Sequence, residues 1–259
     1  MKIINKFDRL KFFVPLERVK TINTDCFQEK IGQKKDTLEI YTEKYSVPQQ
    51  ILRSFLGINE ISIKNDQLLI DITGKIAASQ GNFGLIDKNN IEKVFQTIEN
   101  TGICKFQSLN FNELQILLTD VTKDITVNNK LYYYFSALAL AANTSSQKQK
   151  ILPYKEGILC KQAIKKSTDS FTVYSKYAEL KKAKSDYKKN YISCIGEDFI
   201  NESKQTLRLE RHLSSFNAIR NAFDIKEKII SLADVLNSHK NVVKNRFEEI
   251  FLSGCKEVF

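Results

Sequence analysis

Apolar and polar residues alternate over several short runs of the chain. Alternation with a period of two places every second side chain on the same side, as in a strand with one buried face. Asn65 and Asp66 separate two such runs and give a hairpin signal. The pattern predicts strands at residues 10–14, 36–41, 61–64, 67–73, 104–109, 113–127, 157–163, 171–174 and 204–212.

Other segments repeat their apolar residues at helical spacing. Ile91, Val94, Phe95 and Ile98 recur every three or four positions within residues 86–100, and Gly102 follows as a stop signal. We expect further helices at residues 46–56, 176–189, 216–236 and 240–251. Residues 131–142 form either a helix or a buried apolar segment.

Strand pairs joined by short turns and mixed with helices predict an α+β fold. We expect a central antiparallel sheet with helices on one face. The chain of 259 residues is long enough to bury a substantial core. The main domain is expected at residues 1–212, and residues 213–259 are expected to form a C-terminal helical extension, either a cap or a small second unit.

The alternation also gathers ionisable side chains on one face of the predicted sheet. In residues 204–212, Leu207 and Leu209 share one face, and Arg208, Glu210 and His212 share the other. A polar face of this kind is available for binding or catalysis. Ion pairing between neighbours is the ordinary alternative for such residues.

Two other predicted strands carry aspartates on their polar faces. Asp120 and Asp124 lie opposite Val121, and Asp71 takes a similar position in residues 67–73. Carboxylates with at most one histidine suit a hard divalent cation such as Mg²⁺ or Mn²⁺. The chain has two histidines, far apart in sequence, so a His-hydrophobic-His metal motif is absent.

Tyr174 ends the predicted strand at residues 171–174, and Lys176 follows it. A tyrosine hydroxyl can attack a phosphodiester if a metal ion or a base offsets its reference pKa of about 10. Lys176 is near enough in sequence to hold a phosphate. A tyrosine in a strand is more commonly a packing residue, so the pattern alone leaves both interpretations open.

Charge adds a class of partner. The net charge is +10 and the pI about 9.2, which favours a polyanion. Residues 161–190 contain nine lysines against three acidic residues. We expect nucleic-acid contacts from this segment and from the polar strand face, namely Lys165, Lys166, Lys181, Lys182, Lys184, Lys188 and Arg208. A solvated helix face is the alternative for each lysine.

The cysteines and the hydropathy of the chain indicate in which cellular compartment the protein is expected. The five cysteines are scattered and contain no C-x-x-C spacing, which argues against a disulfide framework or a zinc site. No apolar run reaches the roughly 20 residues of a membrane span. We expect a cytoplasmic protein with no membrane partner.

Four blocks in order resemble the gene II/gene X family of rolling-circle replication initiators from filamentous phages and plasmids. The start at residues 8–16 resembles the family's opening strand with its proline. Residues 69–84 resemble a strand followed by a lysine and a Phe-Gly pair. Residues 118–124 resemble a strand with a central aspartate, and residues 171–180 with 207–211 resemble a tyrosine-x-lysine helix entry and an Arg-x-Glu strand.

The resemblance implies a rolling-circle, relaxase-like palm and a metal-dependent DNA nicking and joining enzyme. Tyr174 would be the nucleophile, Lys176 would stabilise phosphate charge, and Asp120 and Glu210 would bind the metal. Asp71, Asp124 and His212 are further ligand candidates. The product would be a 5′-phosphotyrosine and a free 3′-OH, formed without ATP.

The resemblance also implies the partners: single-stranded or hairpin DNA at a replication origin, with room for a host helicase or polymerase. Two other classes of function stay open. A non-catalytic initiator or repressor would bind duplex repeats through residues 213–251. A basic structural protein of a mobile element would bind DNA without sequence preference.

Overall fold

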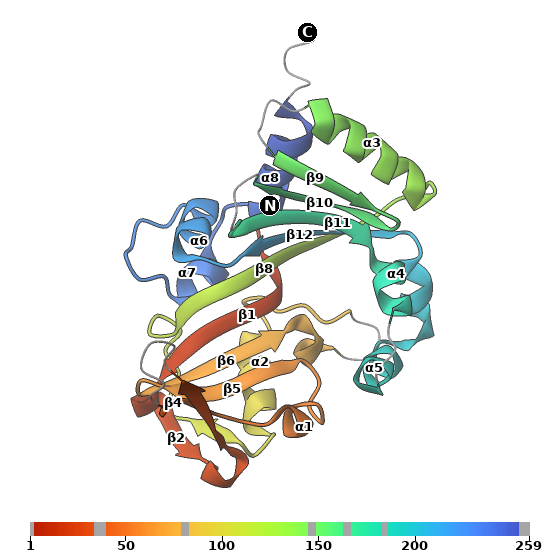
Figure 1. Cartoon of the computed structure of the whole chain (residues 1–259). Coiled ribbons are helices and arrows are strands. Elements are labelled where there is room, and N and C mark those ends of the chain that lie inside the picture. Colours follow the sequence, from red (N-terminus) through yellow and green to blue (C-terminus); the bar gives the residue numbers. More distant parts are fainter. Residues whose placement is uncertain are drawn as a thin grey trace.

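The computed structural model describes residues 3–33, 40–78, 83–144, 149–162, 167–182 and 186–253. Its centre is a ten-stranded sheet in which every neighbouring pair is antiparallel (Figure 1). The strand order is β3 (Gln28–Gln33), β4 (Ile40–Ser46), β5 (Ile58–Lys64), β6 (Gln67–Thr73), β1 (Lys6–Pro15), β8 (Gln115–Thr126), β12 (Thr206–Leu213), β11 (Asp169–Ser175), β10 (Gly157–Gln162) and β9 (Gln149–Tyr154). A separate ribbon pairs β2 (Val19–Ile22) with β7 (Cys104–Phe106).

Eight α-helices and three short 3₁₀ helices are found in the described residues. The α-helices are α1 (Gln49–Leu52), α2 (Ile91–Glu99), α3 (Leu131–Thr144), α4 (Lys176–Lys181), α5 (Asp186–Ser203), α6 (Phe216–Phe223), α7 (Leu232–Asn237) and α8 (Val242–Phe251). The 3₁₀ helices are Leu16–Arg18, Thr24–Cys26 and Gly74–Ala77. The predicted α+β fold with a large antiparallel sheet is confirmed.

One face of the sheet is apolar and covered by helices. Phe12 of β1 packs against Phe95 of α2, with ring centroids 5.6 Å apart, and Phe7 of β1 stacks on Phe223 of α6 at 6.4 Å. Phe171 of β11 contacts the α8 ring of Phe251 in the same way. These contacts belong to one continuous core, so the helices after residue 212 cover the same sheet that the first 212 residues build.

Several predicted elements have different lengths in the structure. The helix expected at residues 46–56 shortens to α1, and the one at 216–236 divides into α6 and α7. The helix expected at 176–189 divides into α4 and α5, and α5 itself is kinked at Gly196, where φ is +77°. Most of the weak strand at residues 36–41 lies outside the described residues. Strands β2, β3 and β9 were not predicted.

The segment 131–142 is a helix and is only partly buried. Tyr132, Tyr133 and Leu140 of α3 are 71%, 62% and 69% exposed, so the alternative of a buried apolar segment is wrong.

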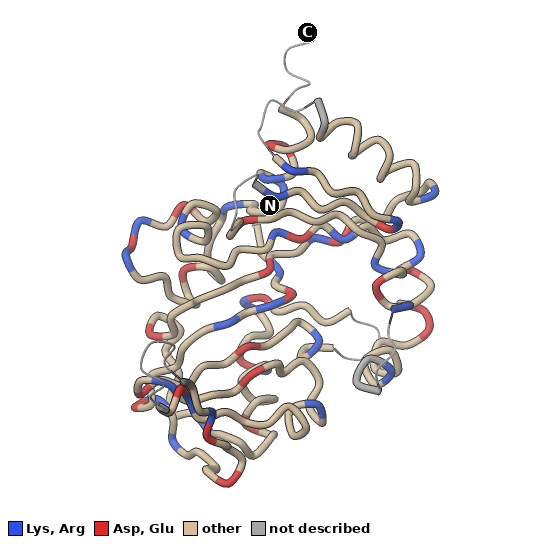
Figure 2. The backbone as a smooth tube through the Cα atoms, viewed as in Figure 1, with Lys and Arg blue, Asp and Glu red and all other residues tan. Residues whose placement is uncertain are grey.

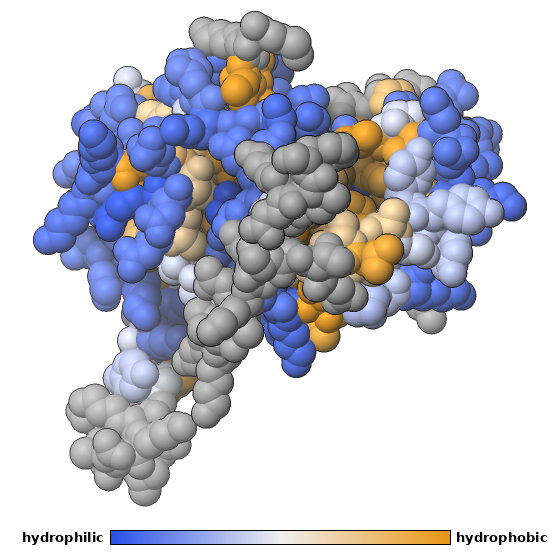
Figure 3. Space-filling model, turned by 90° about the horizontal axis from the view of Figure 1, so that it is seen from above, coloured by the Kyte–Doolittle hydropathy of each residue, from blue (hydrophilic) through white to orange (hydrophobic). Residues whose placement is uncertain are grey.

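Seen from above, the molecule has hydrophobic patches between largely hydrophilic areas (Figure 3). None of the helices in the described part of the chain has the length and hydropathy needed to cross a bilayer.

Candidate functional site

The face of the sheet opposite α2, α6 and α8 carries polar side chains from most of its strands, and α4 borders this face at the end of β11. On the central strands, lysines and arginines alternate with acidic residues (Figure 2). We call this surface the polar face; its members on the central strands are Asp8, Arg9 and Lys11 of β1, Asp120, Thr122 and Asp124 of β8, Arg208, Glu210 and His212 of β12, and Thr172 and Tyr174 of β11. The register confirms the predicted grouping, because Arg208 pairs with Asp124 and His212 pairs with Asp120.

Tyr174 lies near the end of β11, directly before a helix start. The Ser175 hydroxyl caps α4 by accepting a hydrogen bond from the Ala178 amide at 3.2 Å. Tyr174 is paired with Arg208 on the neighbouring strand, and Thr172 is paired with Glu210. Tyr174 and Glu210 are therefore diagonal neighbours on the two strands, and the Tyr174 hydroxyl donates a hydrogen bond to Glu210 Oε2 at 3.0 Å. The structure therefore brings together the predicted nucleophile and one predicted metal ligand.

A pocket of about 370 Å³ opens beside this hydrogen bond. We call it the tyrosine pocket; it is lined by Asp8, Tyr154, Glu156, Thr172, Tyr174, Ser175, Ala178, Glu179, Lys182 and Glu210. Gly157 is the β10 residue paired with both Tyr154 and Tyr174. A Cβ at Gly157 would lie 2.4 Å from the Tyr154 hydroxyl, so the glycine leaves the space that this ring needs at the rim.

Glu210 is a poor acid in this environment. Burial is the main cause, and the neighbouring carboxylates of Asp8 and Asp120 add to it, so that the pKa of Glu210 rises to about 8 despite the charge of Arg208. A carboxylate with this pKa is a stronger base than an exposed glutamate. Glu210 is thus suited to accept the proton of the tyrosine to which it is bonded.

The same surroundings oppose ionisation of the tyrosine. Burial raises the pKa of Tyr174 well above 10, and the charges of Glu210 and Glu179 raise it further, while Arg208 acts in the opposite direction. A cation close to these carboxylates would reverse that balance. The hydroxyl therefore needs both a proton acceptor and additional positive charge before it can attack.

Arg208 is the central cation of the site and is completely buried. Its guanidinium donates two hydrogen bonds to Asp124, both 2.7 Å long, and one to Asp8 at 3.2 Å. We expected Arg208 to contact nucleic acid directly. Its burial and its two carboxylate partners do not fit that role, because no side of the guanidinium reaches the surface. Arg208 instead holds β1, β8 and β12 together beneath Tyr174.

Lys176 is also buried, with 1% of its surface exposed. Its ammonium group donates a hydrogen bond to Glu179 Oε2 at 2.6 Å and lies 5.9 Å from the centre of the Phe83 ring. Burial, followed by repulsion from Arg208, lowers the pKa of Lys176. Burial would raise the pKa of Glu179, but the charges of Lys176 and Arg208 outweigh it and hold that pKa at about 2.

The five predicted metal ligands do not form one cluster. Asp124 is bound by the buried Arg208 through two hydrogen bonds. Asp120 lies 2.5 Å from His212 Nδ1 and acts electrostatically on Glu210, so these three belong to one neighbourhood. The hydrogen bond to Asp120 is the main reason that the pKa of His212 is raised. Asp71 is held separately by two hydrogen bonds from Arg9, 2.9 Å and 2.6 Å long. Asp71 is therefore neutralised by a protein cation.

The site can be tested for its fit to a divalent cation. In the described ranges, no group of three His, Cys, Asp or Glu side chains is arranged to hold a metal ion. Mg²⁺, however, is commonly bound by one or two carboxylates together with substrate phosphate oxygens. Asp120 and Glu210 suit that arrangement, because they belong to one neighbourhood in which Asp8 is a third carboxylate.

The predicted nucleic-acid lysines are only partly described. Lys181 and Lys182 are exposed at the end of α4. Lys182 forms an ion pair with Glu156 at 2.8 Å, and Lys181 lies 4.6 Å from the centre of the Tyr177 ring. Lys165, Lys166 and Lys184 lie outside the described residues. Lys188 belongs to α5, but its side chain is outside the description.

Sequence reasoning missed three members of the site. Asp8 was overlooked because it precedes the predicted strand at residues 10–14. In the structure β1 begins at Lys6, and a β-bulge between Phe7 and Arg9 leaves both Asp8 and Arg9 on the polar face. Tyr154 was overlooked because no strand was predicted at residues 151–156, where Pro153 interrupts a short apolar run. Glu179 is three residues from Lys176, a spacing that does signal a helical ion pair.

No protein-family model matches the chain, and no curated protein matches it.

Proposed function

We propose that this protein nicks and rejoins single-stranded DNA through Tyr174, as the initiating enzyme of rolling-circle replication. The observation that carries the proposal is the 3.0 Å hydrogen bond from the Tyr174 hydroxyl to Glu210, a partly buried carboxylate whose pKa is raised to about 8. It supplies a nucleophile and a base that are already in contact. The resemblance to gene II/gene X initiators supports the role of Tyr174 as the nucleophile, and it implies metal binding for Glu210.

In the proposed reaction, the Tyr174 oxygen attacks phosphorus and forms the new O–P bond. The bond from phosphorus to the 3′ oxygen breaks, and that oxygen leaves with the electron pair. Glu210 takes the tyrosine proton and can return it to the leaving oxygen, so the products are a 5′-phosphotyrosine and a free 3′-OH. Rejoining is the same exchange in reverse, and the phosphotyrosine bond conserves the energy that it needs.

Other residues of the site position these groups. Arg208 fixes the spacing of β8 and β12, and Lys176 holds Glu179 at the wall of the tyrosine pocket. Lys182 at the rim is exposed and near enough to the pocket to meet a DNA phosphate. Asp120 and Glu210 would hold a Mg²⁺ or Mn²⁺ ion, which would supply positive charge against the phosphate and the tyrosine oxygen.

The test is formation of a covalent protein–DNA adduct. A 3′-labelled pool of single-stranded oligonucleotides, incubated with the protein and Mn²⁺, should leave label on the protein in a denaturing gel, because the tyrosine keeps the 5′ phosphate of the 3′ fragment. Tyr174→Phe should abolish the labelled band. Tyr177→Phe, a nearby tyrosine on α4, should retain it. Labelling that survives in Tyr174→Phe would sink the assignment.

A further inference from the structure

A second hollow lies on the polar face, over β1, β6, β5, β4 and β3, and has a volume of about 600 Å³. We call it the basic pocket. Four of its lining residues are cations and two are acidic: Arg9, Lys11, Lys30 and Lys44 against Glu60 and Asp71. The pocket therefore carries an excess of two positive charges on a surface that its own carboxylates do not balance.

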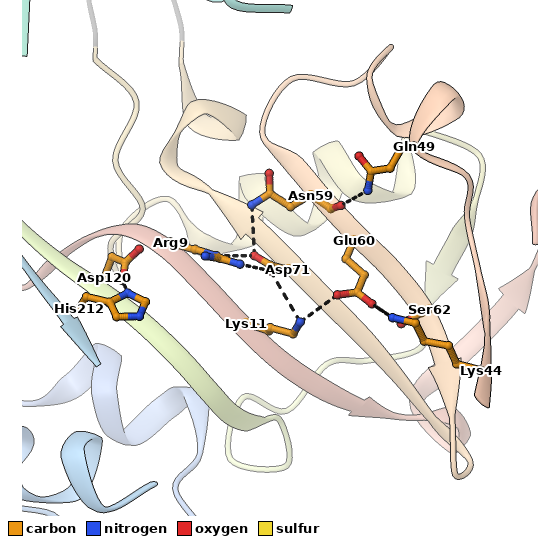
Figure 4. A network of polar contacts seen from close by, with 10 residues as sticks. All are labelled: Arg9, Lys11, Lys44, Gln49, Asn59, Glu60, Ser62, Asp71, Asp120 and His212. Atoms are coloured by element: carbon orange, nitrogen blue, oxygen red, sulfur yellow. Dashed lines mark hydrogen bonds and ion pairs between the residues drawn. The ribbon is translucent and has the colours of Figure 1, made fainter. Parts of the chain in front are cut away.

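Both carboxylates of the basic pocket are already bound by its cations (Figure 4). Arg9 holds Asp71 through two hydrogen bonds. Lys11 donates to Glu60 at 2.8 Å, and Lys44 donates to the other oxygen of the same carboxylate. Burial would raise the pKa of Glu60, but these two lysines outweigh it and hold the pKa at about 2. One carboxylate is thus shared by two ammonium groups.

The register places two of the cations in an unfavourable pair. Lys30 and Lys44 are directly opposite each other on β3 and β4, and like charges in that position destabilise a sheet. Lys30 forms no ion pair with any residue in the described part of the chain, and it lines the same pocket as Lys44. An anion bound between them would relieve this repulsion.

We propose that the basic pocket binds a backbone phosphate of the same DNA strand that Tyr174 attacks. The position of this phosphate relative to the bond that Tyr174 breaks rests on the proposed function. The polar face connects the two sites, because Arg9 of the basic pocket interacts electrostatically with Asp120 and His212. β4 and β11 are six strand spacings apart in the sheet, about 29 Å. That path is the length of about eight stacked nucleotides at 3.4 Å each.

The experiment measures the affinity of a fluorescent 15-nucleotide single strand by anisotropy, in the Tyr174→Phe background so that no bond is made. Lys30→Gln/Lys44→Gln should raise the Kd at least about tenfold and should make the plot of log K against log salt less steep by about 0.7, the value for one phosphate contact on a single strand. The matched control, Lys226→Gln/Lys228→Gln, removes the same charge from the exposed α6–α7 connection on the helical side. It should change the Kd by less than about twofold.

Two further measurements test whether the basic pocket binds a DNA phosphate. Glu60→Gln removes the carboxylate that competes with a phosphate, so it should tighten DNA binding even if it lowers stability. Inorganic phosphate should compete with the oligonucleotide only at millimolar concentration. Equal Kd values for the two double variants would overturn the inference, and so would micromolar competition by inorganic phosphate, which would indicate a site for a small phosphate ligand.

The two proposals fail in different ways. If the protein forms no adduct but Lys30→Gln/Lys44→Gln still weakens DNA binding, the nicking proposal is wrong and the phosphate site stands. If the adduct forms at Tyr174 and the lysine variant binds DNA like the control, the phosphate site alone is wrong.

Discussion

At the tyrosine end of the polar face, Glu210 lies among other carboxylates and its pKa is raised to about 8. At the opposite end, Glu60 lies between two lysines and its pKa is lowered to about 2. Both glutamates are on the same face of one sheet and both are partly buried. The difference comes from their neighbours, and it separates a site suited to proton transfer from a site suited to holding an anion.

The largest expected contrast is between the two glutamates. Glu210→Gln removes the proton acceptor for Tyr174 and should lower the rate of DNA nicking by about 10²–10⁴-fold. Glu60→Gln leaves the tyrosine pocket intact, so its maximal nicking rate at saturating DNA should match that of the unchanged protein. Single-turnover rates of adduct formation measure both. Equal losses in the two variants would remove the distinction between the two ends.

The two arginine–aspartate pairs of the polar face should contribute differently to the free energy of unfolding. Arg208→Met leaves two carboxylates without their shared cation and should cost about 3–5 kcal/mol. Arg9→Met removes a side chain that is 33% exposed, and Lys11 remains 3.8 Å from Asp71, so the cost should be about 1–2 kcal/mol. Urea unfolding gives both values. A larger cost for Arg9→Met would contradict the central place of Arg208.

The pH dependence follows from the raised pKa of Glu210. The ionised carboxylate accepts the proton, so the nicking rate should rise with pH by up to about tenfold per unit and level off above the pKa of Glu210. A cation bound at Glu210 lowers that pKa, so in Mn²⁺ the plateau should begin below pH 8. The folded state also binds this proton more tightly than the unfolded chain does. The contribution of Glu210 to stability should therefore fall as pH rises from about 4.5 to 8, and Glu210→Gln should remove both trends.

The smallest expected effect belongs to the exposed lysines of α4. Lys181→Gln/Lys182→Gln should weaken single-strand binding by only a few-fold at 0.15 M salt, because exposed charges are strongly screened. Lys181 also loses a ring contact with Tyr177. Anisotropy titrations at two salt concentrations would measure the change. A loss as large as that of the basic-pocket lysines would show that the DNA follows α4 rather than the sheet.

Local patterns predicted much of the sheet. The Asn65–Asp66 turn has positive φ at both residues, +49° and +56°, as a tight hairpin turn requires. The alternation in residues 204–212 placed Glu210 and His212 correctly, because β12 is central and one of its faces is fully buried. A buried face fixes the register of a strand.

Helix ends were less predictable because single side-chain contacts decide them. Asp224 adopts a left-handed conformation that ends α6, and Ser231 with Asp234 forms a capping box that begins α7. In the segment after α1, the Ser54 hydroxyl bonds the Ile51 carbonyl and competes with the helix. The prediction of one helix at residues 216–236 did not use the spacing of Ser231 and Asp234, because apolar residues recur on both sides of it.

The site itself was predictable only in part. Tyr174, Asp120 and Glu210 came from motif and alternation, and the structure places them in one neighbourhood. The position of Asp8 on the polar face depends on a β-bulge that the sequence does not reveal. The burial of Arg208 depends on the carboxylates of Asp8 and Asp124, which come from other strands. Long-range pairs of this kind, separated by 84 and 200 positions, leave no periodic signal in a single sequence.

The most direct measurement maps the covalent attachment site. After reaction with single-stranded DNA and Mn²⁺, nuclease and protease digestion followed by mass spectrometry should find a nucleotide on the peptide that contains Tyr174, and the yield should collapse in Glu210→Gln. Attachment to Tyr154, which lines the same pocket, or to Tyr177 would contradict the account, and so would cleaved DNA with no attached nucleotide.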